Sequence, residues 1–256
     1  MHKIDINCDM GESYGQFQVG NDDILFPYIS SSNIACGYHG GDPLFIENTI
    51  KKALNLNLNI GAHPSYPDLA GFGRRKMEMS FDELRTIIKY QVSAVKGICE
   101  SLGGKLSHVK PHGALYNTAA NDEKVSLAIV SAIREIDSSL ILLGKSSSQM
   151  EKVAKEKKVR FASEAFIDRR YDKSGNLVHR SIAEAVISDP DIAITQALDI
   201  ILKKKVLTID NEYINIECDS LCIHGDNPIA GKILEKLKDS FEQNNIEISP
   251  LLNVES

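Results

Sequence analysis

Lys3-Ile4-Asp5-Ile6-Asn7-Cys8-Asp9-Met10-Gly11-Glu12 is the stretch that decides the fold class, because a short β-rich run in it leads directly into polar residues. The same arrangement recurs at residues 36–43, 61–64, 108–113 and 222–228. Where strands alternate with helices in a closed parallel sheet, the residues after the strands converge on one face, and active sites of such folds lie there. The pattern therefore predicts an enzyme.

Short β-rich runs alternate with helical patterns along the chain. The runs are continuously apolar for most of their length, as expected for strands that are buried on both faces of a parallel sheet. We expect strands at residues 3–8, 32–36, 58–62, 106–109, 140–143, 159–162 and 220–223.

Capping signals mark several of the helices. The capping box Ser80-Phe81-Asp82-Glu83 starts a long helix, and Gly103-Gly104 ends it. Asp189-Pro190 offers an N-cap followed by proline at the first helical position. By the same rule, Asn227-Pro228 is expected to start a last helix that runs to about residue 244.

One segment interrupts the alternation, because residues 206–209 and 213–216 have the pattern of an antiparallel hairpin. The seven expected strands in β-α order predict an α/β fold, a single (β/α) barrel domain over residues 1–256 that is irregular or incompletely closed. A doubly wound open sheet is the alternative. It is less favoured, because an open sheet would spread the polar motifs along its edge.

Composition limits the partners and the compartment. The chain has 256 residues, 43% of them hydrophobic, which suffices for one large core. A formal net charge of -6 disfavours nucleic acid and anionic membranes as partners. Five cysteines without a C-x-x-C pair indicate reduced thiols, and no apolar run approaches the roughly 18 residues of a membrane span. We expect a soluble cytoplasmic protein.

The first motif places carboxylates at the end of the first expected strand. Asp5, Asn7 and Asp9 alternate and so share one face of that strand, and Glu12 follows Gly11 in the loop. A carboxylate pair there binds a metal or acts as acid and base. The alternative is a buried Asp/Asn network that holds the strand in place.

Histidines gather at the expected strand ends, each beside glycine or proline. Any one of them alone is as readily a hydrogen-bonded structural residue, but four together are a stronger signal. Asp9 with two of these histidines would satisfy a divalent metal site with open positions, although no H-x-x-H spacing supports it. His108, inside a strand, is expected to pack in the interior. The four histidines are His39, His63, His112 and His224.

Cationic residues in three of the motifs suit an anionic substrate. Arg74 and Arg75 lie in a glycine-rich loop, Lys110 precedes Pro111-His112, and Arg169 follows the sixth expected strand. The alternative for the arginine pair is pairing with surface acids such as those at positions 78 and 82. A nucleotide motif is lacking, because Gly144-Lys145-Ser146 has no glycine at position 139 to make a Walker A sequence.

Taken together and in order, six motifs resemble those of the LamB/YcsF family, over residues 4 to about 229. His179 departs from the pattern, since a proline is expected there. The motifs are D-x-N-C-D-M-G-E-S (5–13), S-N-I-A-C-G-Y-H-G-G-D-P (32–43), G-A-H-P-S-Y-P-D-L-x-G-F-G-R-R (61–75), H-V-K-P-H-G-A-L-Y-N (108–117), S-E-A-F-I-D-R-R-Y (163–171) and C-I-H-G-D-N-P (222–228).

The resemblance implies a seven-stranded barrel similar to the glycoside hydrolase/deacetylase fold. It also implies a 5-oxoprolinase activity, the ATP-dependent opening of 5-oxo-L-proline to L-glutamate together with the B and C subunits of that enzyme. ATP is then a cosubstrate, with a nucleotide site that is atypical or shared with a partner. Two other readings stay open: a metal-dependent amide or sugar deacetylase that acts alone, and a non-enzymatic binder of small ligands.

The site residues follow from these motifs. Four are predicted to be catalytic, and the first three of them are also the candidate metal ligands: Asp9, His63, His112 and Glu12. Six are predicted to bind the substrate: Lys110, Arg74, Arg169, His39, His224 and Asp226.

Overall fold

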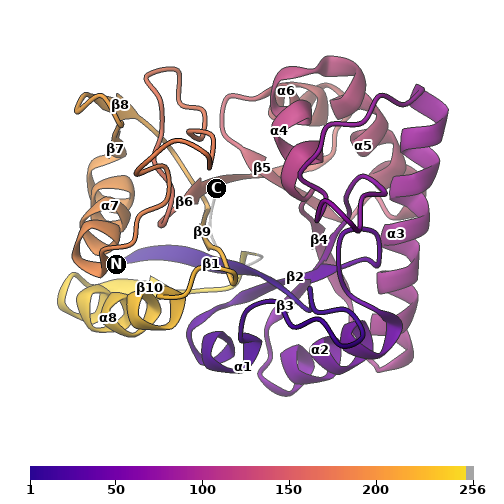
Figure 1. The fold of residues 1–256 in the computed structure, drawn as a ribbon, viewed down its shortest axis with the longest axis horizontal. Coiled ribbons are helices and arrows are strands. Elements are labelled where there is room, and N and C mark those ends of the chain that lie inside the picture. The colour runs from indigo at the N-terminus through magenta and orange to yellow at the C-terminus, as the bar shows by residue number, and fades with distance from the viewer. Residues whose placement is uncertain (252–256) are drawn as a thin grey trace.

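Strands and helices alternate in a closed parallel barrel in the computed structural model, which describes residues 1–251 (Figure 1). Every neighbouring pair of barrel strands is parallel, and β9 pairs with β6 on one side and β1 on the other. The barrel prediction is confirmed, whereas incomplete closure and the open sheet are wrong. The strands are β1 (His2–Met10), β2 (Ser31–Ala35), β3 (Asn59–His63), β4 (Leu106–Val109), β5 (Ile141–Lys145), β6 (Arg160–Phe166) and β9 (Ser220–Ile223).

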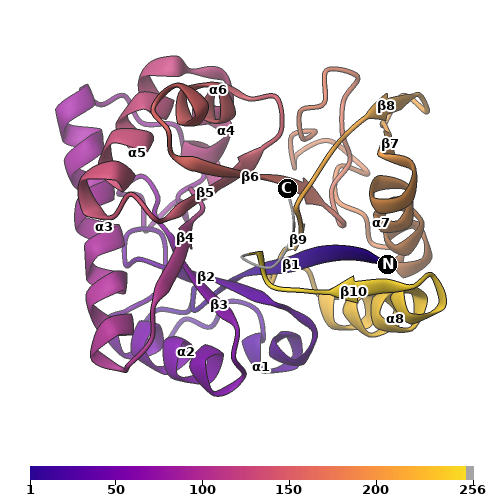
Figure 2. The same cartoon turned by 180° about the vertical axis from the view of Figure 1, so that it is seen from behind.

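Helices surround the barrel, most of them following a strand (Figures 1 and 2). Ser80 and Glu83 form the expected capping box at the start of α3, and the Asp189 side chain caps α7. The helices are α1 (Asp22–Leu25), α2 (Pro43–Asn55), α3 (Phe81–Ser101), α4 (Gly113–Asn121), α5 (Glu123–Ile136), α6 (Gln149–Glu156), α7 (Pro190–Lys203) and α8 (Ala230–Gln243), with a 3₁₀ turn η1 (Phe26–Tyr28).

The start of α8 differs from the prediction. Its first residue is Ala230, and Asn227-Pro228 forms a turn before it instead of the N-cap and first helical position. The Asn227 side chain accepts from the Ile229 N–H and donates to Asp168 at 3.2 Å. That side chain is thus engaged with the carboxylate that follows β6, and the helix begins after the turn.

Two small additions accompany the barrel. The predicted hairpin is confirmed as β7 (Lys205–Leu207) and β8 (Tyr213–Asn215). The sequence did not predict β10 (Ile246–Ile248), which pairs in parallel with the first residues of β1 (Figure 2). Because β1 pairs with β10 through residues 2–4 and with β9 through residues 5–8, one long strand both closes the barrel and holds the last strand.

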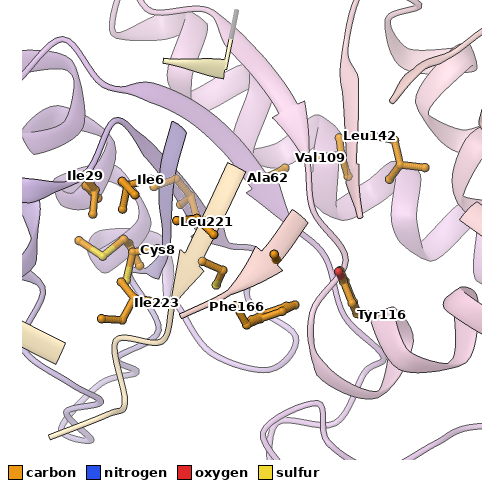
Figure 3. Packing of buried hydrophobic residues seen from close by; sticks show 14 of the residues in the cluster. Ile6, Cys8, Ile29, Ala62, Val109, Tyr116, Leu142, Phe166, Leu221 and Ile223 are labelled. Carbon is orange, nitrogen blue, oxygen red and sulfur yellow. The ribbon is translucent and has the colours of Figure 1, made fainter. Parts of the chain in front are cut away.

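The apolar core lies between the strands and the helices. Figure 3 shows Ile6, Cys8, Ile29 and Ile223 gathered beside β1 and β9, and all four are buried. Burial of each large aliphatic side chain stabilises the fold by about 1.5–3 kcal/mol. Neighbouring residues of a strand point to opposite faces, so alternate residues of β1 point into the barrel when the others pack in this core. The polar side chains among them need hydrogen-bond partners inside the barrel.

The helices of residues 1–251 include none that is long and apolar enough to cross a membrane.

Candidate functional site

A cavity of about 640 Å³ opens at the carboxyl ends of the barrel strands. Asp9 lies near the end of β1, His63 ends β3, Lys110 follows β4, Lys145 ends β5 and His224 follows β9. The barrel thus brings together residues that are far apart in sequence, as the motifs predicted. Most of the predicted site residues line the cavity: Asp9, His63, Arg74, Lys110, His112, Arg169 and His224.

Polar side chains inside the barrel form a hydrogen-bonded network, and this network holds β1 in place. Asp5 accepts hydrogen bonds from the hydroxyls of Ser30, Ser31 and Ser220. Burial raises the pKa of Asp5 to about 6, although these hydroxyls act to lower it. The alternative reading of the first motif, a buried network, is therefore confirmed for Asp5. His108, buried as predicted, bonds the side-chain oxygen of Asn33 at 2.7 Å across the barrel.

Lys110 is the buried cation at the floor of the cavity. Its Nζ lies 3.0 Å from Asp9 Oδ1, 2.7 Å from Glu164 Oε1 and 3.0 Å from the Asn7 side-chain oxygen. Burial alone would lower the pKa of Lys110, but Asp9, Cys222 and Glu164 hold it well above its usual value. Lys110 donates hydrogen bonds to Asn7, Asp9 and Cys222 and forms an ion pair with Glu164, so that it holds both carboxylates beside it.

Four side chains form a buried cluster next to Asp9, which we call the histidine cluster: Glu12, His39, His63 and His112. One ligand atom of each lies within 4.8 Å of those of the others. The His39 and His112 rings are stacked, with centroids 3.7 Å apart, and His39 Nε2 lies 2.9 Å from Glu12 Oε1. His63 Nε2 lies 2.9 Å from His112 Nδ1 and 3.3 Å from Asp9 Oδ2. Glu12 and His39 are thus not in the cavity wall but directly behind it.

Backbone carbonyls hold the two facing histidines. His63 Nδ1 lies 2.7 Å from the Lys110 carbonyl oxygen, and His112 Nε2 lies 2.9 Å from that of Phe72. Burial, with the neighbouring imidazoles His39 and His63, lowers the pKa of His112 well below its usual value. Burial opposes ionisation of Asp9, but the adjacent His63 and Lys110 hold its pKa well below the usual range. Asp9 is therefore an ionised carboxylate at neutral pH.

A second imidazole–carboxylate pair faces the same cavity. His224 Nδ1 lies 2.8 Å from Asp168 Oδ1, and its ring stacks on Phe166 with centroids 5.4 Å apart. Burial opposes ionisation of Asp168, but the His224 ring and its hydrogen bond lower the pKa of this carboxyl. A ring nitrogen of His224 lies within 4.8 Å of Asp9 and Cys222. The pair orients His224 toward the carboxylate of Asp9.

Arginines form a cationic rim around the cavity. Arg74 and Arg180 both pair with Asp226, at 2.5 and 2.9 Å. Arg169 is largely buried, and its guanidinium donates to the backbone carbonyls of Val178 and residue 185. Burial, followed by the nearby Arg180, lowers the pKa of Arg169 to about 10, so it stays charged at neutral pH. Within residues 1–251, no carboxylate lies within ion-pair distance of Arg169, so the rim keeps a positive excess.

Both arginines pair with acids, as the alternative predicted, but their partners are not the acids at positions 78 and 82. Arg74 reaches Asp226, and Arg75 pairs with Asp68, which lies in the same loop. The loop turns back on itself, so that Arg74 faces the cavity while Arg75 stays outside it.

Three charged residues of the cavity, all carrying acidic, lysine or arginine side chains, were not in the predicted set. Glu164 was expected beyond its strand, but β6 extends to Phe166 and turns Glu164 into the barrel. Arg180 comes from an irregular loop, where no strand or helix signal marks it. Lys145 ends β5 and bonds the Asn176 side-chain oxygen at 2.7 Å. Only the apolar run before Lys145 could have indicated its position.

Comparison with known proteins identifies the family of the chain. The LamB/YcsF family model matches residues 4–256. The chain belongs to the LamB/YcsF family. It is 45% identical over 251 residues to the A subunit of the Clostridium beijerinckii 5-oxoprolinase, with 98% of each chain covered.

Solved structures support the fold of this LamB/YcsF protein. The lactam utilization protein of Thermus thermophilus superposes with a TM-score of 0.91 at 39% identity, covering 96% of this chain and 98% of that chain. The catalytic domain of a peptidoglycan N-acetylglucosamine deacetylase from Eubacterium rectale gives a TM-score of 0.52 at 8% identity, covering 99% and 90%. The second likeness shows a shared fold, and the deacetylase-like barrel prediction is confirmed.

Proposed function

We propose that this chain is the A component of a 5-oxoprolinase and that its cavity opens the ring of 5-oxo-L-proline to give L-glutamate. One observation carries the proposal: the buried Asp9 carboxylate and the His224–Asp168 pair face each other beneath a cationic rim. The name of the C. beijerinckii relative supports the choice of substrate. At about 640 Å³, the cavity is in the range of small-molecule sites.

The cationic rim accounts for recognition of the anion. 5-Oxoproline carries one carboxylate, and Arg169 is the rim cation with its charge unopposed by a carboxylate at ion-pair distance in the described chain. Arg74 and Arg180 share one carboxylate and so contribute one further positive charge. A charge-assisted hydrogen bond of this kind contributes about 1.5–3 kcal/mol to binding.

ATP explains how an unstrained amide becomes reactive. Transfer of the γ-phosphoryl group to the lactam oxygen, with loss of the N–H proton, gives a C=N bond and a phosphorylated oxygen. Water then adds to that carbon, the ring C–N bond breaks as the nitrogen is protonated, and an acyl phosphate remains. A second water displaces phosphate and leaves glutamate. We assign the phosphoryl transfer to a site shared with the partner B and C subunits, since the chain has no Walker A sequence.

Two residues carry the proton transfers in this scheme. Asp9 accepts the proton of the attacking water, while Lys110 and the Asn33 amide hold its other carboxylate oxygen in place. His224, held by Asp168, protonates the departing ring nitrogen. Because its pKa is depressed, Asp9 is a weak base, and the water needs further activation.

A metal-dependent amide or sugar deacetylase that acts alone is the second candidate. The histidine cluster favours it, because imidazoles and a carboxylate around one point are a common hydrolytic metal site. The deacetylase fold of the E. rectale domain supports only the architecture.

Glutamate release from 5-oxoproline distinguishes the two functions. We expect turnover only when this chain, ATP and the B and C subunits are all present. Turnover by the isolated chain without ATP would contradict the proposal and support the deacetylase-like alternative. If the complete mixture formed no glutamate while the B and C subunits were folded and bound, the proposed substrate would be wrong.

A further inference from the structure

We infer that the histidine cluster is a site for one divalent transition-metal ion, with His63 Nε2, His112 Nδ1 and Glu12 as its ligands. The inference rests on hydrogen-bond geometry and not on the proposed function, since binding of an ion is measured without substrate.

The first step is the tautomer of each facing histidine. A carbonyl oxygen only accepts, so a ring nitrogen bonded to one must carry a proton. His63 Nδ1 faces the Lys110 carbonyl, and His112 Nε2 faces that of Phe72. In their neutral forms, both rings therefore present a lone pair at the other nitrogen, His63 Nε2 and His112 Nδ1.

The second step is that these two lone pairs point at each other. His63 Nε2 and His112 Nδ1 lie 2.9 Å apart, and Glu12 Oε1 lies 3.5 Å from His112 Nδ1. Three electron-rich atoms gathered in a buried place repel one another unless a cation lies among them. Two nitrogens bound to one ion at about 2.1 Å lie roughly 3.0–3.4 Å apart, which is close to the observed spacing.

The charge balance of the floor also calls for a cation. The buried carboxylates of Asp9 and Glu164 pair with Lys110, whereas the buried Glu12 has no lysine or arginine at ion-pair distance within residues 1–251. Asp9 Oδ1 already accepts from Lys110 and from an amide, whereas its Oδ2 faces His63 at 3.3 Å. A divalent ion would compensate the remaining negative charge, with Asp9 Oδ2 beside it.

The donor set indicates the kind of ion. Two imidazoles and a carboxylate suit Zn²⁺, Co²⁺, Ni²⁺ or Mn²⁺ better than Ca²⁺. Histidine ligands of metals almost always donate the other ring N–H to a carbonyl or carboxylate, as His63 and His112 do here. When bound, such an ion lowers the pKa of a coordinated water, which is the activation that a weakly basic Asp9 needs.

The test is metal binding by the full chain. The purified chain is stripped with a chelator, and Zn²⁺ binding is measured by equilibrium dialysis, with the visible absorption of Co²⁺ as a second probe. We expect one ion per chain, with affinity at least tenfold lower in His112→Gln and in Glu12→Gln. His179→Gln, which changes an exposed histidine of the cavity wall, is the matched control and should bind as the wild type does.

Two results would overturn the inference. One is a folded wild-type chain that binds neither Zn²⁺ nor Co²⁺ at micromolar concentrations. The other is a Glu12→Gln or His112→Gln variant, folded by circular dichroism, whose affinity and Co²⁺ spectrum match those of the wild type. The first result would overturn the inference even if both variants failed to fold.

Discussion

Replacing Lys110 with methionine removes the one buried cation that holds Asp9 and Glu164. Methionine keeps the apolar stem but leaves two buried carboxylates facing each other without the ammonium that lies 3.0 and 2.7 Å from them. Removal of one partner of a buried ion pair typically costs about 3–5 kcal/mol, because the remaining charge is neither paired nor solvated. We expect Lys110→Met to lower the free energy of unfolding by about that amount and to abolish glutamate formation.

Urea denaturation of the purified chain at pH 7 measures this cost. The double variant Lys110→Met/Glu164→Gln should recover about 1–3 kcal/mol relative to Lys110→Met, since one of the two unpaired charges is gone. Lys145→Met is the matched control, because this half-buried lysine bonds only an amide oxygen and should change the stability by less than about 1 kcal/mol. A Lys110→Met chain as stable as the wild type, or a double variant no more stable than Lys110→Met, would refute the reasoning.

Three further predictions concern stability and are measured by urea denaturation. Gly61→Ala would place a Cβ atom against the His108 ring and should destabilise the fold by at least about 1–3 kcal/mol. Its matched control is Gly97→Ala on helix α3, where the added Cβ meets no neighbouring atom and should stabilise the fold by roughly 0.5–1 kcal/mol. Asp226 has a pKa of about 2 in the fold because the two rim arginines outweigh its burial, so Asp226→Asn should lose about 2 kcal/mol at pH 7. The pKa is depressed, so this contribution is present above about pH 4 and disappears as the pH falls toward 2, where variant and wild type should converge. Ser80→Ala removes the capping hydroxyl of α3 and should cost about 1 kcal/mol.

The strands could be located from the sequence because a buried parallel strand has a strong local signal. The run at residues 106–109 follows the glycine pair that ends the capped helix α3, and β4 has the predicted bounds. Closure of the barrel has no local sequence signal, because the pairing of β1 with β9 joins residues about 215 positions apart. The short strand β10 (Ile246–Ile248) was missed because three residues carry too little pattern.

The sequence predicted which residues gather at the site, but it did not predict what each of them contacts there. The polar residues after each strand converge on one cavity, as parallel strands require. Lys110 was expected to bind the substrate, yet its ammonium is directed at Asp9 and Glu164. Nothing local in the sequence reveals this, because Glu164 was expected in a loop and lies inside the barrel, where β6 continues to Phe166 beyond its expected end at residue 162.

The central claim is that the ring opens at Asp9, and glutamate formation by an Asp9→Asn chain tests it most directly. The variant is combined with the B and C subunits, ATP and 5-oxoproline, and complex formation is followed in the same samples. We predict an assembled complex that forms glutamate about 10²–10⁴ times more slowly than the wild type. Glutamate formation at the wild-type rate by a folded, assembled Asp9→Asn complex would contradict the account.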